Sequence, residues 1–146
     1  MNKERRTAII NSVKDGIMDA AVRYNAYTGR MSELSHGPEY LITVSIADRL
    51  RKSVSPSYVY PEDPMGNVYE PMTAPPKSYG KSKRYDVILR GSDKRSEVGI
   101  EVKNRVYSPT KLVLRDLERL IETLKLSDSG DPILDMGIFC VLHNAL

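Results

Sequence analysis

The sequence predicts a mixed α/β or α+β domain in which helices and strands follow one another along a chain of 146 residues. Three segments carry apolar residues at three- and four-residue spacing, which is typical of amphipathic helices. Two short apolar runs around the polar turn "RGSDKR" predict a β-hairpin, and the late run "MGIFCVLHN" predicts a final strand. The length suits a single domain, residues 1–146, with its own hydrophobic core.

The composition is that of an ordinary globular protein, with 40% hydrophobic and 28% charged residues and a net charge of +3. No apolar run approaches the roughly 20 residues that cross a bilayer, and the N-terminal segment lacks the apolar region of a secretory signal. Cys140 is the only cysteine, so we expect a buried thiol and no disulfide within the chain. One cysteine and two histidines are too few for the usual structural zinc site. We therefore expect a cytoplasmic protein.

The first two helices are predicted at residues 3–24 and from about Pro38 to residue 52. Gly29 and the polar residues around it end the first helix. Proline suits the first helical position because its missing N–H has no helical partner there. The second helix buries a stripe made of Ile42, Ile46, Ala47 and Leu50.

Residues 51–84 differ from the rest of the chain in composition, because they hold six of the nine prolines and four of the nine tyrosines. Residues 57–62, "SYVYPE", are predicted as a short strand and the rest as an extended excursion, since proline disfavours helices and interior strands. The excursion ends in "KSYGKSKR", a basic run without an acid. Either a nucleic-acid partner or a solvated loop explains that run. Its basic residues are Lys77, Lys81, Lys83 and Arg84.

The hairpin strands are "YDVIL" and "SEVGIEVKN". Strand alternation predicts that Tyr85, Val87 and Leu89 share one face, with Asp86 on the other. After the hairpin, Ser108 is predicted to cap a helix that has Pro109 in its first position and runs to Lys125. The last strand is predicted to be buried on both faces because its apolar run is nearly continuous.

The helix after the hairpin has a clear division of residue types. Its apolar stripe, which we expect to face the core, consists of Val113, Leu117, Leu120, Ile121 and Leu124. Its charged residues are predicted to form the exposed face, stabilised by ordinary ion pairs. They are Arg115, Asp116, Glu118, Arg119 and Glu122.

Charged residues in the middle of the hairpin predict a metal-binding catalytic site. Folding the hairpin about its turn places Asp86 opposite about position 101, and Glu101 and Lys103 share that face. Two carboxylates at this distance repel each other unless a cation lies between them. Mg²⁺ is a suitable cation because it prefers oxygen ligands, and the Val102 carbonyl could supply a further oxygen. Lys103 could then stabilise the charge that develops when water attacks a phosphodiester. A solvated sheet face is the alternative interpretation.

Glu39 is a fourth candidate for the site. It lies on the core-facing stripe of its helix, three positions before Ile42, where an unpaired charge is unfavourable. The helix dipole alone also favours glutamate in a first turn, so both explanations stay open.

"YDVIL" followed by "GIEVKN" resembles the PD-(D/E)xK nuclease superfamily, which has the restriction-endonuclease-like fold. Asp86 matches the first acid of its signature, and Glu101 and Lys103 match the (D/E)-x-K part. Tyr85 stands where the motif has its proline. Glu39 resembles the helical glutamate of many members. The predicted elements over 38–142 are similar to the family's αβββαβ core, a mixed four-stranded sheet flanked by helices, with residues 3–24 as an extra N-terminal helix.

The resemblance implies cleavage of DNA that depends on Mg²⁺, with Mn²⁺ as a substitute. Asp86, Glu101 and the Val102 carbonyl would bind the metal, with Lys103 and Glu39 completing the catalytic set. A homodimer is expected, because one such site cuts one strand, and the tyrosines of the excursion are candidate dimer contacts. The expected contacts to DNA are Lys77, Lys81, Lys83, Arg84 and Lys111.

Two other hypotheses stay open. The chain could be a catalytically inactive nucleic-acid-binding or assembly subunit with the same fold. Alternatively, the motif occurs by chance in an unrelated α/β interaction protein.

Overall fold

The computed structural model of the chain describes residues 1–29, 34, 37–55, 57–68, 83–106, 108, 110–124 and 132–143. Its elements follow in the order α1 (Lys3–Thr28), α2 (Glu39–Ser53), β1 (Tyr58–Pro64), α3 (Met65–Val68), β2 (Arg84–Arg90), β3 (Ser96–Lys103), α4 (Lys111–Thr123) and β4 (Met136–Val141). The predicted DNA contacts Lys77 and Lys81 lie outside the described residues. No described helix is both long and apolar enough to cross a membrane.

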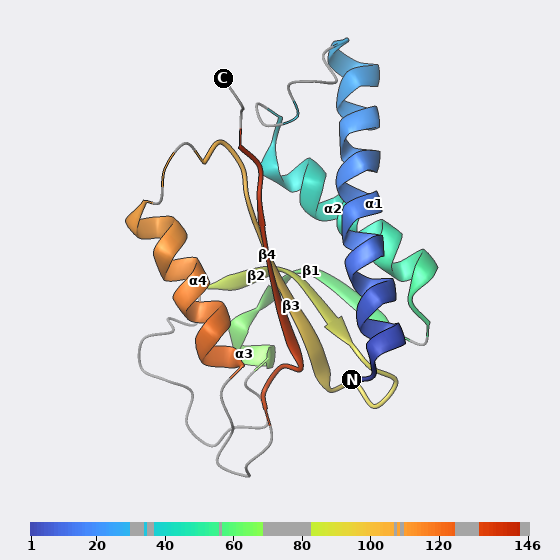
Figure 1. Cartoon of the computed structure of the whole chain (residues 1–146), viewed down its shortest axis with the longest axis vertical. Coiled ribbons are helices and arrows are strands. Elements are labelled where there is room, and N and C mark those ends of the chain that lie inside the picture. Colours follow the sequence, from blue (N-terminus) through green and yellow to red (C-terminus); the bar gives the residue numbers. More distant parts are fainter. Residues whose placement is uncertain are drawn as a thin grey trace.

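The strands form one mixed sheet in the order β1-β2-β3-β4. β1 and β2 pair antiparallel, as do β2 and β3, whereas β3 and β4 pair parallel and are joined through α4. In Figure 1, α1 and α2 pack on one face of the sheet and α4 packs on the other. The predicted α/β fold, with a mixed four-stranded sheet flanked by helices, is therefore confirmed for the described residues.

The paired helices α1 and α2 confirm two predicted elements. α1 begins after Asn2, whose side chain accepts a hydrogen bond of 2.9 Å from the backbone N–H of Arg5. It ends at Gly29, whose φ of 70° is the left-handed conformation common after a helix. α2 starts at Glu39 with Pro38 as its N-cap, one residue later than predicted, and its predicted apolar stripe is buried.

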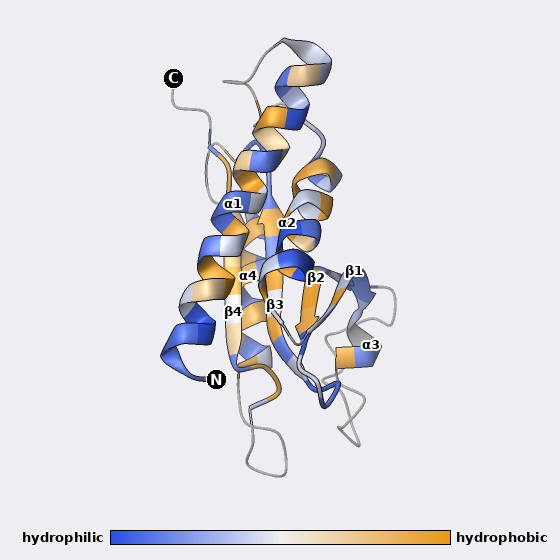
Figure 2. Ribbon diagram, turned by 90° about the vertical axis from the view of Figure 1, so that its right-hand side faces the viewer, coloured by the Kyte–Doolittle hydropathy of each residue, from blue (hydrophilic) through white to orange (hydrophobic). Residues whose placement is uncertain are grey.

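Each face of the sheet buries its own hydrophobic layer, and in Figure 2 the apolar colour is strong along β2 but not along β1. The layer beneath α1 and α2 includes Val87 and Leu89 of β2. The layer beneath α4 includes Tyr85 and Ile88, together with Leu120. The prediction that Tyr85 shares a face with Val87 and Leu89 is therefore wrong, because side-chain alternation along β2 breaks between Tyr85 and Val87.

The prediction that the last strand is buried on both faces is also wrong. β4 lies at the edge of the sheet and, within the described part of the chain, pairs only with β3. Most of its side chains are half-buried, and Val141 is exposed. Cys140 is buried as expected, and burial raises the pKa of its thiol to about 11, which keeps it protonated and inert.

α4 begins later than predicted. Its N-cap is Thr110 instead of Ser108, because the Thr110 hydroxyl accepts a hydrogen bond of 3.3 Å from the backbone N–H of Val113. Pro109, the predicted first helical residue, lies outside the described residues. The helix ends at Thr123, before the predicted Lys125.

The predicted faces of α4 are correct only in part: Leu120 is buried and Arg115 and Glu118 are exposed, as expected. Arg119 is buried and Asp116 half-buried against the sheet, although both were predicted on the exposed face. In contrast, Leu117, Ile121 and Leu124 are exposed. The side of the helix that carries Arg119, Leu120 and Thr123 faces the sheet, where Arg119 pairs with a buried carboxyl group of β3, as described below.

Gly16 permits the close crossing of α1 and α2. A Cβ atom at this position would lie 2.6 Å from Cα of Ile46. We predict that Gly16→Ala lowers the free energy of unfolding by about 1–3 kcal/mol, because backbone atoms must move apart to admit the methyl group. Urea unfolding measures this change, with Asn11→Ala on the exposed side of α1 as a control that reports helix propensity alone. A more stable Gly16→Ala variant would contradict the prediction.

Candidate functional site

β2 and β3 stop pairing where two predicted site residues meet. Their ladder places Val87 opposite Ile100, a register that agrees with the predicted placement of Asp86 opposite Glu101. Next to this pair, Oδ2 of Asp86 accepts a hydrogen bond of 2.6 Å from the backbone N–H of Val102. A side-chain oxygen thus takes the place that a strand carbonyl has in a regular ladder, and the Asp86 carboxylate turns toward β3.

Glu101 is the most deeply buried carboxylate of the site, with 1% of its surface exposed. Arg119 of α4 donates two hydrogen bonds to it, from Nε at 3.1 Å and from Nη2. Both bonds end on Oε1, so Oε2 is not held by Arg119. The guanidinium carbon also lies 5.7 Å from the centre of the Tyr85 ring. This cation compensates in part for the loss of water around the buried carboxyl group.

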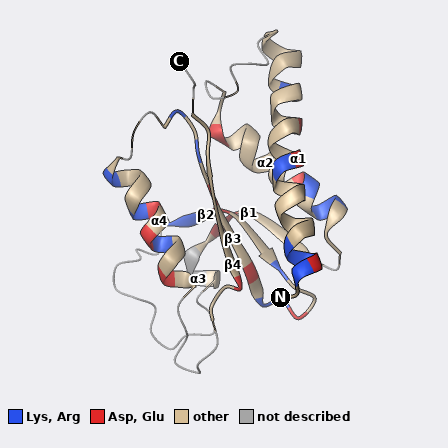
Figure 3. Cartoon of the chain, in the orientation of Figure 1, with Lys and Arg blue, Asp and Glu red and all other residues tan. Residues whose placement is uncertain are grey.

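Lys103 continues the site along the same face of β3. Its Nζ lies 3.1 Å from Oδ2 of Asp116 and 3.7 Å from Oε1 of Glu39. Asp116 in turn lies 2.9 Å from Nη1 of Arg119, so charges of alternating sign run from Glu39 to Glu101. Figure 3 shows that α4, which supplies two members of this row, carries residues of both signs along its length.

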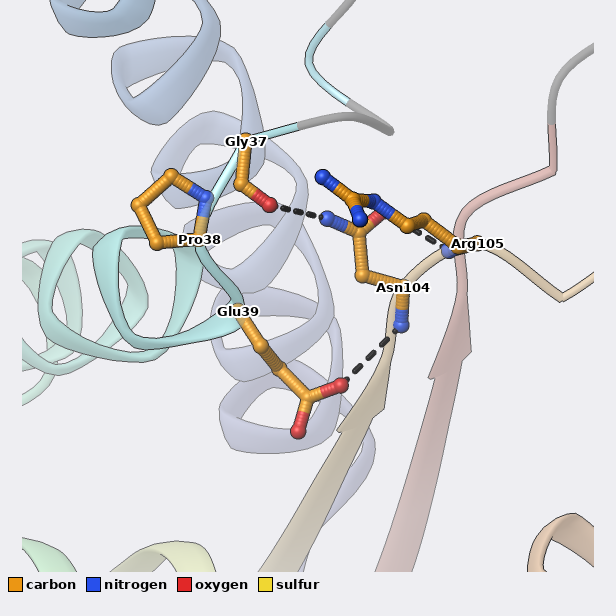
Figure 4. A pocket seen from close by; sticks show the side chains of 5 residues that line it. All are labelled: Gly37, Pro38, Glu39, Asn104 and Arg105. Carbon is orange, nitrogen blue, oxygen red and sulfur yellow. Dashed lines mark hydrogen bonds between the residues drawn. The ribbon is translucent and has the colours of Figure 1, made fainter.

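A cleft of about 500 Å³ opens beside Glu39, and its other lining residues are Gly37, Pro38, Asn104 and Arg105. The backbone N–H of Asn104 donates to Oε2 of Glu39 at 3.1 Å, and Nδ2 of Asn104 donates to the Gly37 carbonyl at 2.6 Å. In Figure 4 the Arg105 side chain lies beside Asn104, near Gly37. The φ of Arg105 is 57°, a strained conformation for a residue with a side chain. The cleft thus combines a carboxylate with a cationic side chain.

Burial changes the protonation of the two facing carboxyl groups. It raises the pKa of Asp86, although the hydrogen bond from Val102 opposes this change. Burial also raises the pKa of Glu101 to about 8, since lost hydration outweighs the attraction of Arg119. The negative charge of Asp86 adds to this effect on Glu101. The ionisation of each carboxyl group is therefore coupled to that of the other.

The charge balance of the site favours a further cation. When all are ionised, four carboxylates (Asp86, Glu101, Glu39 and Asp116) face two cations (Lys103 and Arg119), which leaves a formal charge of −2. A divalent cation with oxygen ligands would neutralise it. Within the described ranges, however, no three His, Cys, Asp or Glu side chains are grouped so that they could hold a metal ion. The donor set is thus a pair of carboxylates, to which a backbone carbonyl and water molecules would be added.

The predicted DNA contacts that the structure describes are exposed. Lys83 and Arg84 lie at the start of β2, directly before the strand residues that carry the site. Lys111 is exposed in the first turn of α4. These three cations are therefore accessible to a phosphate backbone.

Four site residues were not predicted: Asp116, Arg119, Asn104 and Arg105. The first two were assigned to a solvated face, because charged residues on an amphipathic helix usually face water. Their three-residue spacing places them on one side of α4, and the need of Glu101 for a cation could have indicated that side. Asn104 and Arg105 follow the "EVK" run directly, but only the folded chain brings them beside Glu39.

Comparison of the chain with protein-family models, with curated proteins and with solved structures finds no match. Functional inference therefore depends on the site itself and on the order of the elements around it.

We predict that Glu101 makes stability depend on pH. An unfolded glutamate has a pKa near 4.5, whereas that of folded Glu101 is about 8, so between these values only the folded state holds the proton. The free energy of unfolding therefore falls as pH rises through this range. Urea unfolding at several pH values measures this change. The free energy of unfolding of the wild type, minus that of Glu101→Gln, should fall as pH rises through this range. A gap independent of pH would contradict the prediction.

Proposed function

We propose that the chain is a metal-dependent endonuclease of the PD-(D/E)xK type, which hydrolyses phosphodiester bonds of DNA in the cytoplasm. The observation that carries this proposal is the hydrogen bond from the backbone N–H of Val102 to Asp86, because Val102 lies between Glu101 and Lys103 on β3. The order α2, β1, β2, β3, α4, β4 around one mixed sheet supports the restriction-endonuclease-like αβββαβ core that the resemblance implies.

The donor set fits a hard divalent cation. Asp86, Glu101 and the Val102 carbonyl would hold Mg²⁺ or Mn²⁺, and ion binding would favour the ionised form of Glu101, whose pKa is about 8. When bound, such an ion polarises a phosphate and lowers the pKa of a water molecule. Oε2 of Glu101, which Arg119 does not hold, is the oxygen best suited to the ion.

Lys103 has the most specific role in this mechanism. Its ammonium is held between Glu39 and Asp116, which orients it at the end of β3. From there it would stabilise the negative charge that builds on the phosphate as water attacks. Glu39 would orient both Lys103 and an attacking water, and the adjacent cleft with Arg105 would receive the neighbouring phosphate.

One observation favours a second candidate function. Arg119 already supplies a cation to Glu101, so the buried carboxylate is stabilised without a metal ion. A chain in which this ion pair is permanent would be the catalytically inactive nucleic-acid-binding or assembly subunit. The two candidates thus differ in whether a divalent cation can join the pair.

We predict metal-dependent nicking of supercoiled plasmid DNA by the purified protein. Mg²⁺ or Mn²⁺ should support cleavage, and EDTA should abolish it. Asp86→Asn and Lys103→Met should each slow cleavage by roughly 100-fold or more, because each removes a group that stabilises the transition state. Lys94→Met, in the exposed turn at the other end of the hairpin, should leave the rate unchanged and is the matched control.

Thermal unfolding and DNA binding separate the two candidate functions. If the site binds metal, Mn²⁺ should raise the melting temperature of the wild type but not that of Glu101→Gln. DNA binding measured by fluorescence anisotropy, without cleavage and without this thermal shift, would identify the inactive subunit. The absence of DNA binding, cleavage and thermal shift together would contradict both functions.

A further inference from the structure

α4 presents an apolar stripe to solvent. The α4 stripe consists of Leu114, Leu117, Ile121 and Leu124, whose exposed fractions are 47%, 38%, 50% and 40%. The opposite side of the helix is buried against the sheet through Arg119, Leu120 and Thr123. An apolar row of this length on a helix that already packs on its own sheet is typical of a protein interface.

The spacing within the α4 stripe is that of a helix-packing seam. Its members follow one another at intervals of three, four and three residues, which is the alternation of the two core positions of a coiled coil. Such a seam packs against another helix with the same spacing. An antiparallel copy of α4 provides one, because Leu114 then meets Leu124 of the copy, and Leu117 meets Ile121.

The charges beside the α4 stripe are complementary to those of a second copy of α4 that runs in the opposite direction. Lys111 and Arg115 lie on one flank in the N-terminal half of α4, and Glu118 and Glu122 lie on the same flank in the C-terminal half. In Figure 3 the upper end of α4 is blue and its lower end is red, with both colours between them. In antiparallel packing, the basic half of each helix therefore lies opposite the acidic half of the other.

We propose that the chain forms a two-fold symmetric homodimer in which the α4 stripes of two copies pack antiparallel. Self-complementary charge and spacing favour a second copy over an unrelated partner, because a symmetric interface uses the same patch on both subunits. The stripe points away from β3, whereas Arg119 and Asp116 point toward it. Each site would therefore stay open in the dimer.

The size of the surface sets the expected affinity. α4 has 13 residues, so two such helices bury less area than a standard stable interface. We therefore expect a dissociation constant of about micromolar order, and sedimentation velocity over a range of concentrations should show a monomer–dimer equilibrium. A wild-type protein that stays monomeric at a concentration of several hundred micromolar, on the order of 100-fold above that value, would overturn the proposal.

Substitutions in the stripe test its location. Leu117→Glu and Ile121→Glu should each raise the dissociation constant by about 100-fold, because each would bury an unpaired carboxylate between the helices. Leu112→Glu is the matched control, because Leu112 is 69% exposed on the same helix but lies outside the stripe. Circular dichroism verifies that each variant stays folded. Dimers that withstand both stripe substitutions would overturn the proposal.

A charge exchange tests the antiparallel orientation. Arg115→Glu alone and Glu122→Arg alone should each weaken the dimer by about three- to tenfold, because each brings like charges together. The double variant Arg115→Glu/Glu122→Arg should restore wild-type affinity. These two residues are seven positions apart on one helix, so the rescue must come from contact between copies. Failure of the rescue would overturn the antiparallel arrangement. Neither residue belongs to the proposed catalytic set, so loss of the dimer and loss of DNA cleavage are distinguishable.

Discussion

The pairing of Glu101 with Arg119 fixes how α4 lies on the sheet, and the arrangement of the site depends on it. Glu101 projects from β3 into a layer that also contains Tyr85 and Leu120, where a lone carboxylate is strongly disfavoured. Arg119 reaches it because the side of α4 that carries Arg119, Leu120 and Thr123 faces the sheet. That rotation also brings Asp116 to Lys103. It leaves Leu114, Leu117 and Leu124 exposed, whereas Leu120 is buried.

A second constraint acts at the neighbouring strand. Because Asp86 accepts the backbone hydrogen bond of Val102, the ladder between β2 and β3 is replaced at this point by a side chain. The same change directs Tyr85 toward α4, where its hydroxyl donates a hydrogen bond of 2.9 Å to Thr123. Backbone pairing, packing of the aromatic ring and placement of the carboxylate are therefore consequences of one local break in strand alternation. Functional groups commonly occur at such irregular positions.

Local patterns were sufficient for the elements whose neighbours in space are also neighbours in sequence. The hairpin register followed from the turn, because two strands joined by a short connection have little freedom to slip. α1 and α2 followed from their apolar spacing and from Gly29 and Pro38. Local patterns were insufficient to predict the position of β4 in the sheet, because its apolar sequence suits an interior strand as well as an edge strand. Its position at the edge depends on how many strands the sheet contains, which no local pattern specifies.

The sequence by itself determined the α/β class, the hairpin and the candidate set of Asp86, Glu101, Lys103 and Glu39. These depend on periodicity and on spacing along one or two strands. Only the tertiary structure decided that Arg119 and Asp116 belong with this set and that the stripe of α4 faces solvent. The physical reason is that helix amphipathicity reveals two faces but not which of them meets the sheet. Here a buried carboxylate made that choice, because its need for a cation outweighed the burial of several leucines.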